Sequence, residues 1–207
     1  MLDEHAKKLA AFVKSLPDFI HYETYDGNYN HIGATVADAV LQRGHNYESQ
    51  VRPRIDRIRR DYSDATSTSA ALQVLEIIGP SNYLDWGDDN NRDCKLFYAI
   101  LVLFKRCNVE TEEDLRKWLS DNKNLMILKS LGGIGPKTAD YFGILVGLNK
   151  TAIDMHLRNF LARTGVKNLN YDDTQKIIEK CAQLLNKKVV KFDHSIWQYE
   201  RKKSAEK

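Results

Sequence analysis

The chain has 207 residues, 43% of them hydrophobic and 29% charged, so it is long enough to bury a core in one large domain or two small lobes. Its formal net charge of +3 is compatible with a nucleic-acid partner but does not identify one. The longest apolar run, LFYAILVLF at 96–104, is far shorter than the roughly 20 residues that span a bilayer, and the N-terminus shows no targeting signal. We therefore expect a soluble protein that is cytoplasmic or associated with the nucleoid and has no membrane partner.

Helical periodicity runs along most of the chain, and no segment shows a convincing strand pattern, so an all-α fold is predicted. The expected helices cover 4–15, 33–43, 47–62, 66–79, 92–107, 111–122, 122–131, 136–148, 155–164, 172–186 and 194–203. The fourth helix is expected to end at Gly79. The 92–107 helix is apolar nearly all round, and such a helix is expected to be buried centrally.

The cysteines argue against a metal centre. Cys94, Cys107 and Cys181 are far apart, and no CxxC pair or His/Cys cluster offers the spacing of metal ligands. We expect no zinc site, no iron–sulfur cluster and no other cofactor.

The stretch LGGIGPKTAD at 131–140 predicts a helical hairpin that extends over 122–148. A short amphipathic helix leads into the turn GGIG, and Pro136 opens the next helix, where its missing N–H costs little. Gly133 and Gly135 permit positive φ and close backbone approach. Such a turn exposes backbone N–H groups at a helix N-terminus, which is a ready phosphate site. The glycines alone fit a plain helical hairpin equally well.

Two charged residues near the hairpin favour a functional interpretation. Lys137 lies in the first turn of the expected helix, where the helix dipole disfavours a cation. A lysine amine that has lost its proton is a nucleophile. Asp154 precedes the expected helix at 155–164, and its simplest role is to cap that helix. The cap needs only one carboxylate oxygen, so a second role is compatible with it.

Taken together, LGGIGPKTAD and AIDMHLRNFLAR resemble the helix-hairpin-helix DNA glycosylases, the superfamily of endonuclease III, the adenine glycosylase and the oxoguanine glycosylases. The family pattern is a hairpin LPGVGxKTA followed, after a short interval, by VDTHxxR. Lys137 matches the lysine nucleophile of the bifunctional members, and Asp154 matches their catalytic aspartate. His156 and Arg158 match the positions that follow it. Gly132 replaces the usual proline, a change that is harmless for the turn.

The resemblance also implies a fold. The chain lacks the four-cysteine iron–sulfur loop of endonuclease III, so it is more similar to the cluster-free branches, including the small oxoguanine glycosylases. The implied architecture is a two-lobed helical bundle in a single unit over 1–207. One lobe covers about 35–118, and the other combines 1–34 with 119–207 and carries the hairpin. The implied partner is double-stranded DNA with a damaged base, bound by a monomer.

The implied activity is base excision with strand nicking. The damaged base leaves the stack, Lys137 attacks C1′ of the sugar as the base departs, and the resulting Schiff base undergoes β-elimination. Asp154 would stabilise positive charge on the sugar and help to deprotonate the lysine. The hairpin would hold the DNA backbone, with Gly133, Gly135 and Thr138 as the expected contacts.

Residues elsewhere in the chain complete the expected site. Gln42 and Arg43 end the second expected helix and are the candidates for a wedge that fills the space of the extruded base, unless they simply face solvent. His45, Asn46 and Trp86 are candidates for the substrate pocket. Ordinary loop polarity explains the first two equally well, and a core position explains the tryptophan.

Two other functions stay open. A non-catalytic hairpin module would bind DNA through the glycines and would need neither Lys137 nor Asp154. A monofunctional glycosylase would release the base with water and leave the strand uncut. The arginine-rich segment at 52–60 either contacts phosphate or forms a solvated helix face. An oxidised base, above all an oxidised purine, is the lesion that the resemblance favours.

Overall fold

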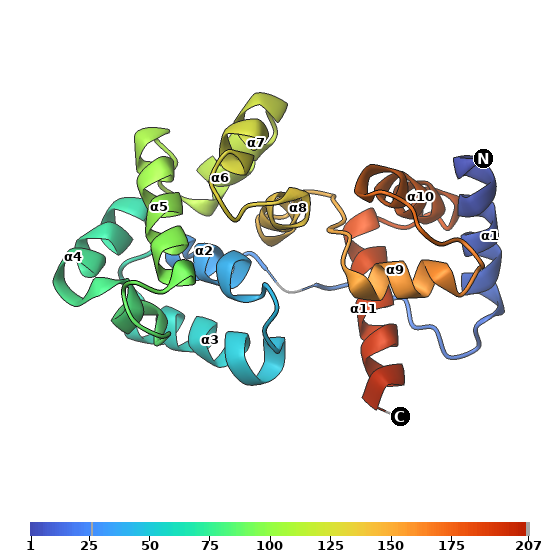
Figure 1. Ribbon diagram of the computed structural model, residues 1–207, viewed down its shortest axis with the longest axis horizontal. Helices are drawn as coiled ribbons and strands as arrows, with labels where there is room; N and C mark the ends of the chain where they lie inside the picture. The colour runs from blue at the N-terminus through green and yellow to red at the C-terminus, as the bar shows by residue number, and fades with distance from the viewer. Residues whose placement is uncertain (26, 206–207) are drawn as a thin grey trace. The chain divides into compact units, whose positions relative to one another are not determined.

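The computed structural model describes residues 1–25 and 27–205, and these residues form helices and connecting loops with no strand (Figure 1). The predicted all-α class is thereby confirmed. The elements are α1 (Leu2–Ser15), α2 (Ile32–Leu41), the π-helical turn η1 (Tyr47–Val51), α3 (Arg52–Asp61), α4 (Thr68–Leu84), α5 (Arg92–Arg106), α6 (Glu112–Leu119), α7 (Asn122–Lys129), α8 (Pro136–Leu145), α9 (Met155–Ala162), α10 (Tyr171–Leu184) and α11 (Val189–Ala205). None of the helices in this part of the chain combines the length and the hydropathy that a bilayer-spanning segment requires.

α4 consists of two helical segments that meet at a break at Gly79. Gly79 has a φ of 75°, outside the helical range, so the first segment ends there as predicted. Pro80 starts a second segment that runs to Leu84, where no helix was expected. Asp89 supplies the cap of that second segment from the following loop, because its Oδ1 accepts a hydrogen bond from Ser81 N at 2.8 Å.

The chain divides into two compact units. The central unit comprises Gly27–Leu148, and the terminal unit combines Met1–Asp26 with Asn149–Lys207. The lobes implied by the resemblance had their boundaries near 35 and 118 instead. The difference concerns the hairpin, because α8 packs on α2 and shares its hydrophobic core, which places the hairpin in the central unit.

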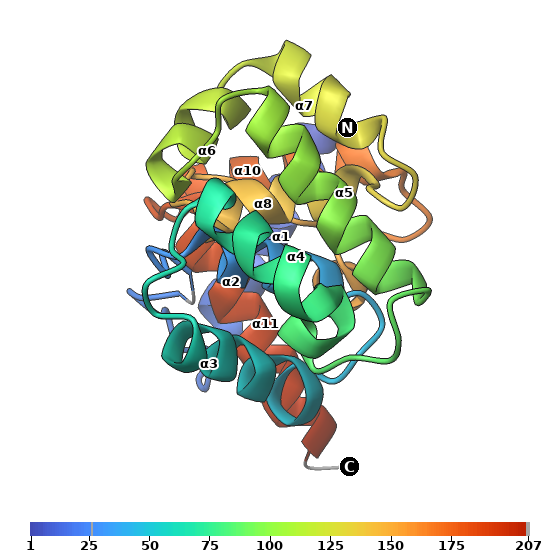
Figure 2. The same ribbon diagram turned by 90° about the vertical axis from the view of Figure 1, so that its left-hand side faces the viewer.

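α2 is the innermost helix of the central unit. All ten of its residues are buried, and it contacts α3, α4, α5 and α8. In Figure 2, α4 and α5 lie side by side in front of it. Glycine and alanine allow this close approach, and a Cβ added at Gly33 would lie 2.2 Å from the hydroxyl of Tyr83. The central position predicted for the 92–107 helix was wrong, because α5 buries one face and leaves Tyr98 45% exposed on the other.

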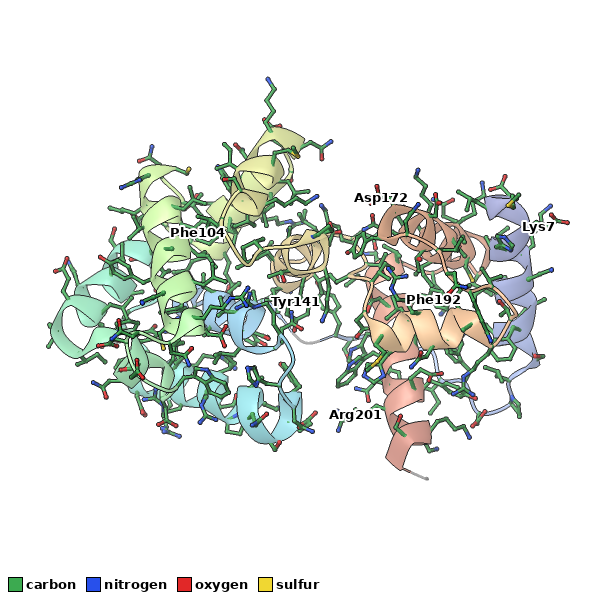
Figure 3. All side chains as sticks on the ribbon, viewed as in Figure 1. Lys7, Phe104, Tyr141, Asp172, Phe192 and Arg201 are labelled. Carbon is green, nitrogen blue, oxygen red and sulfur yellow. The ribbon has the colours of Figure 1, made fainter. Side chains whose placement is uncertain are left out.

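The terminal unit is built on aromatic packing. α1 packs against α10, and α9 packs against α11. The ring of Phe19 lies 5.6 Å from that of Phe160 and 6.3 Å from that of Phe192, which Figure 3 labels on α11. Cys181 is buried in the same core.

A histidine caps the N-terminus of α2, and its protonation state matters. His31 Nδ1 accepts a hydrogen bond from Ala34 N at 3.2 Å, and Nε2 lies 3.0 Å from Tyr62 O. Both contacts are satisfied when the ring is neutral and carries its proton on Nε2. Burial lowers the pKa of His31 below its usual 6.5, although the backbone hydrogen bonds oppose this effect.

We expect this histidine to make the central unit less stable in acid. The folded state holds the neutral ring, so the unfolded state binds more protons, and the free energy of unfolding falls as the pH drops below about 6.5. His31→Asn keeps a capping oxygen but does not titrate, so its unfolding free energy should change less between about pH 7 and about pH 5. Urea unfolding of both proteins at the two pH values tests this, and equal pH dependence would contradict it.

Candidate functional site

The two predicted glycines of the hairpin turn between α7 and α8 have different backbone conformations. Gly133 has a φ of 102°, which favours glycine, and a Cβ there would lie 3.1 Å from Arg43 Nη1. Gly135 has φ −91° and ψ 178°, and it is the N-cap residue of α8, with Pro136 directly after it. Of the two glycines that permit a positive φ, Gly133 adopts one, whereas Gly135 leads into the helix in extended backbone.

Arg43 ties the turn to the rest of the central unit. Its Nη1 donates to Gly133 O at 2.7 Å, its Nη2 pairs with Asp93 Oδ1 at 2.5 Å, and its Nε donates to Val40 O at 2.9 Å. The side chain is only 18% exposed. The guanidinium predicted to contact DNA is therefore engaged inside the protein, where it holds α2, α5 and the hairpin turn together.

Lys137 and Gln42, far apart in the sequence, meet in the structure. Lys137 is half-buried in the first turn of α8, and its Nζ donates a hydrogen bond to Gln42 Oε1 at 3.0 Å. The predicted nucleophile and the predicted wedge are thus direct neighbours. Thr138 follows on the buried side of α8, with 5% of its surface exposed, so its side chain belongs to the interior of the unit.

A buried carboxylate lies one helical turn from Gln42 on α2, and the sequence analysis did not select it. Asp38 is 0% exposed, and its Oδ2 accepts a hydrogen bond from Tyr29 Oη at 2.6 Å. Tyr47 Oη donates to the same oxygen at 3.5 Å, and Tyr141 Oη on α8 donates to Oδ1 at 3.2 Å. Burial, with the Asp38 charge as the next cause, raises the pKa of Tyr29, so this phenol stays a donor. An aspartate within an almost wholly apolar helix was the available signal.

The predicted pocket residues separate into two kinds. The rings of His45 and Trp86 pack nearly perpendicular to each other, with their centroids 4.6 Å apart. The guanidinium of Arg54 lies 4.8 Å from the centroid of the Trp86 ring. His45 Nε2 also lies 3.6 Å from Asp93 Oδ2. Asn46 instead caps η1 from an exposed position, because its Oδ1 accepts a hydrogen bond from the N–H of the third residue after it.

The arginine-rich segment forms part of α3, and two of its side chains bind backbone carbonyls at the end of α4. Arg54 Nε donates to Asp85 O at 2.7 Å, and Arg57 donates to Asn82 O at 3.1 Å and to Tyr83 O. These contacts satisfy carbonyls that a helix C-terminus leaves without a partner. A structural role therefore accounts for part of the arginine run.

Asp154 belongs to the terminal unit and caps α9 as predicted. Its Oδ1 accepts a hydrogen bond from Leu157 N at 2.9 Å. Within the described ranges, its other oxygen has no hydrogen bond or ion pair. The cap therefore uses one oxygen and leaves the second one available.

An aromatic cluster, missed by the sequence analysis, follows Asp154 in the same unit. The Trp197 ring lies 6.1 Å from that of His194, nearly parallel to it, and 6.4 Å from that of His156. The guanidinium of Arg201 lies 4.9 Å from the Trp197 ring, and Tyr22 packs edge-on against His194 at 5.5 Å. Tyr22 and Arg201 also line a cavity of about 330 Å³. Within the sequence of α11, Trp197 looked like a simple core position.

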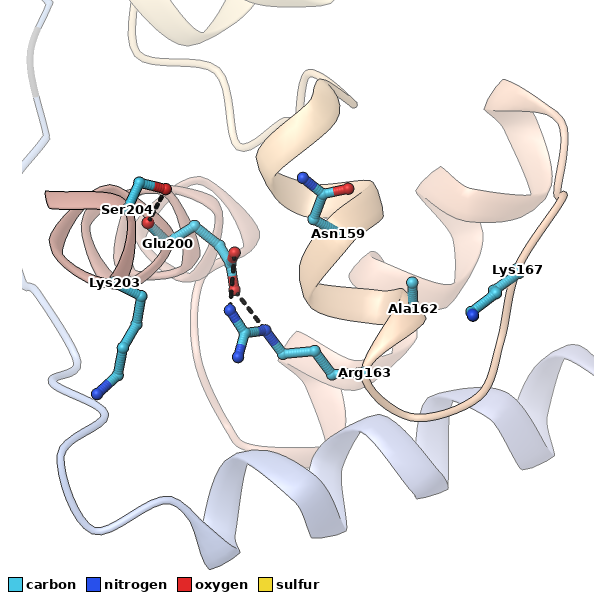
Figure 4. Close-up of a pocket in the computed structure, with 7 residues that line it drawn as sticks. All are labelled: Asn159, Ala162, Arg163, Lys167, Glu200, Lys203 and Ser204. Atoms are coloured by element: carbon cyan, nitrogen blue, oxygen red, sulfur yellow. Dashed lines mark hydrogen bonds and ion pairs between the residues drawn. The ribbon is translucent and has the colours of Figure 1, made fainter. Parts of the chain in front are cut away.

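A second cavity of the terminal unit, of about 390 Å³, lies between α9 and α11 (Figure 4). Its buried carboxylate, Glu200, is paired with Arg163 at 2.9 Å from Nε to Oε1 and 3.1 Å from Nη2 to Oε2. Lys203, another lining residue, pairs with Asp18 at 2.9 Å. Because most charges here already have partners, and neither predicted catalytic residue lines the cavity, the candidate site is placed at the hairpin instead.

The hairpin geometry yields a prediction with a matched control. Gly133→Ala should lower the free energy of unfolding by about 1–3 kcal/mol, because alanine is strained at this φ and its Cβ meets Arg43 and Leu96. Gly132→Ala adds the same atom where nothing lies within 4 Å, so its effect should stay within about 0.5 kcal/mol. Denaturant unfolding measures both, and equal effects would show that the Gly133 turn is not constrained.

Comparison with known proteins gives a family but no activity. A family model described as "Domain of unknown function (DUF8548)" matches residues 97–201. The matched region contains the hairpin, Lys137 and Asp154, whereas α2 with Asp38 and Gln42 lies outside it. No curated protein and no solved structure is similar enough to the chain to count as a match.

Proposed function

Because the chain belongs to the family of domains of unknown function DUF8548, whose description names no activity, we propose from its own residues that it is a DNA glycosylase with AP-lyase activity. The proposal assigns the chain to the helix-hairpin-helix glycosylases that its sequence resembles. The substrate is double-stranded DNA with a damaged base, an oxidised purine being the first candidate.

The observation that carries the proposal is the placement of one amine. Lys137 is the second residue of α8, after the glycine turn and Pro136, and this half-buried residue donates a hydrogen bond from its Nζ to Gln42. The helix dipole makes a lysine costly in this first turn, and none of the described acidic side chains forms an ion pair with it. A lysine with only a structural role would gain one hydrogen bond there, whereas a nucleophile needs a fixed amine next to a turn that can bind phosphate.

The reaction follows from this placement. The amine attacks C1′ of the extruded nucleotide, and the bond from C1′ to the base breaks. The sugar ring opens to give an imine between Lys137 and C1′. Loss of a C2′ proton then expels the 3′ phosphate and nicks the strand, and hydrolysis of the imine frees the lysine. Asp154 stabilises the positive charge that develops on the sugar.

One further feature of the central unit supports the proposal. Arg43 fixes the turn through the carbonyl of Gly133, and this fixed geometry suits binding to the spacing of phosphates rather than to a base sequence.

Borohydride trapping on a panel of duplexes tests the proposal. Each duplex carries one defined lesion or one abasic site, and borohydride reduces the imine to a stable amine. We expect a covalent protein–DNA adduct with at least one lesion, and without borohydride we expect a nicked strand. Base release without adduct or nick would indicate a monofunctional glycosylase, and binding without either reaction would indicate a DNA-binding module; both results would overturn the lyase assignment.

A further inference from the structure

Two polar contacts form parallel rungs between α2 and α8. Asp38 and Gln42 are four residues apart on α2, and Lys137 and Tyr141 are four residues apart on α8. Each pair therefore lies on one face of its helix. Tyr141 Oη donates to Asp38 Oδ1 at 3.2 Å, and Lys137 Nζ donates to Gln42 Oε1 at 3.0 Å.

The contact between Tyr141 and Asp38 is held firmly by the fold and therefore fixes the place of the contact between Lys137 and Gln42. Asp38 is fully buried and accepts hydrogen bonds from three tyrosines on three different segments, Tyr29, Tyr47 and Tyr141. Of the three, Tyr141 lies on α8, and a hydrogen bond to a buried charged group is among the stronger ones in proteins, so this contact resists sliding of α8 along α2. The backbone positions of Gln42 and Lys137 relative to each other are therefore set by the packing of the two helices.

Gln42 lacks the second partner that a structural glutamine would have. Its Nε2 is buried and has no hydrogen-bond partner in the part of the chain that the structure describes. Leaving such a donor unpaired costs stability. The contact with Lys137 is thus the polar contact that orients this amide, and unpaired buried groups of this kind are found where a site is built for a purpose other than stability.

We infer that Gln42 is a positioning residue for the reaction proposed above, which holds the Lys137 amine in place through its Oε1 atom. This inference rests on the proposed function, and it differs from the wedge role that the sequence suggested for Gln42. A wedge must leave the protein surface to enter the duplex, whereas Gln42 closes α2, with φ −63° and ψ −6°, and its oxygen is engaged by the amine.

For Gln42→Leu, a positioning role predicts a loss of trapping rate, whereas a wedge role predicts a loss of DNA affinity. A positioning residue affects the reaction after DNA has bound, and misplacement of a reacting group by about 1 Å costs up to about 10²-fold in rate. We therefore expect trapping at saturating enzyme, on a duplex with one preformed abasic site, to slow by about 10- to 100-fold. The Kd for a duplex with a reduced abasic analogue should stay within about twofold.

A second variant separates positioning from general damage to the fold. Gln42→Glu keeps an acceptor oxygen and almost the same side-chain volume, so it should unfold like the wild type, and a loss of trapping in it cannot come from a cavity or a disrupted fold. Gln73→Leu, at an exposed position of α4, is the matched control and should react like the wild type.

Each result bears on a different statement. Wild-type trapping together with a slow Gln42→Leu at unchanged Kd supports the inference. Wild-type trapping with Gln42→Leu reacting at the full rate but binding DNA weakly overturns it in favour of a wedge, and leaves the proposed function standing. Failure of the wild type to form an adduct with any of the duplexes overturns the proposed function, and the positioning role falls with it.

Discussion

Replacing Lys137 with glutamine will abolish borohydride trapping and strand nicking and leave the fold intact. The amide is not a nucleophile and cannot form an imine, so the rate of nicking should fall by roughly 10³-fold or more. The side chain is half-buried and, among the described residues, donates one side-chain hydrogen bond, to Gln42 Oε1, an acceptor that also suits an amide N–H. Removal of a cation from the first turn of α8 also relieves an unfavourable interaction with the helix dipole.

The measurements for this variant are adduct formation on denaturing gels, strand cleavage, and the free energy of unfolding. Lys123→Gln is the matched control, because it makes the same change of charge at an exposed position of α7, away from the turn of the hairpin. We expect the control to keep its activity and both variants to unfold within about 1 kcal/mol of the wild type. Nicking at the control's rate by Lys137→Gln would show that another group performs the chemistry.

The helices of this chain were predictable because their signals are local. The capping box at the start of α6, where Thr111 and Asp114 satisfy each other's backbone N–H groups, can be read from residues three apart. The wholly buried α2 was harder to recognise, because its burial on every side depends on how α3, α4, α5 and α8 pack against small residues. Apolar character alone indicated that α5 would be the central buried helix, although α5 keeps an exposed face with Tyr98 on it.

The hairpin and its lysine were predictable in the same way, since glycine, proline and lysine stand together in one short motif. The partners of these residues were not. Arg43 meets Gly133 and Asp93, and Gln42 meets Lys137, across separations of 50 to 95 residues, which local patterns do not encode. Asp38 illustrates the limit, because its three tyrosines come from the loop before α2, from η1 and from α8, and the tertiary fold brings them to one carboxylate.

Asp154→Asn will slow base release strongly at constant stability. The observed hydrogen bond from Leu157 N to Oδ1 shows that the side chain caps α9, and asparagine caps a helix about as well as aspartate. The unfolding free energy should therefore change by less than about 0.5 kcal/mol. The neutral amide cannot stabilise positive charge on the sugar, and the loss of one such electrostatic contribution typically costs about 10²–10³-fold in rate.

Three substitutions at this position separate charge from cap, because they remove the two properties in different combinations. Asp154→Asn and Asp154→Ser keep a capping oxygen and lose the charge, whereas Asp154→Ala loses both and should cost about 1 kcal/mol of stability. If the carboxylate is catalytic, all three variants release the base equally slowly in single-turnover assays, whatever their stability. If Asp154 is only a cap, Asp154→Asn and Asp154→Ser keep the wild-type rate, and any loss in Asp154→Ala follows its unfolding. The capping hydrogen bond uses Oδ1 and leaves the other carboxylate oxygen available for the sugar. We therefore expect all three variants to release the base equally slowly.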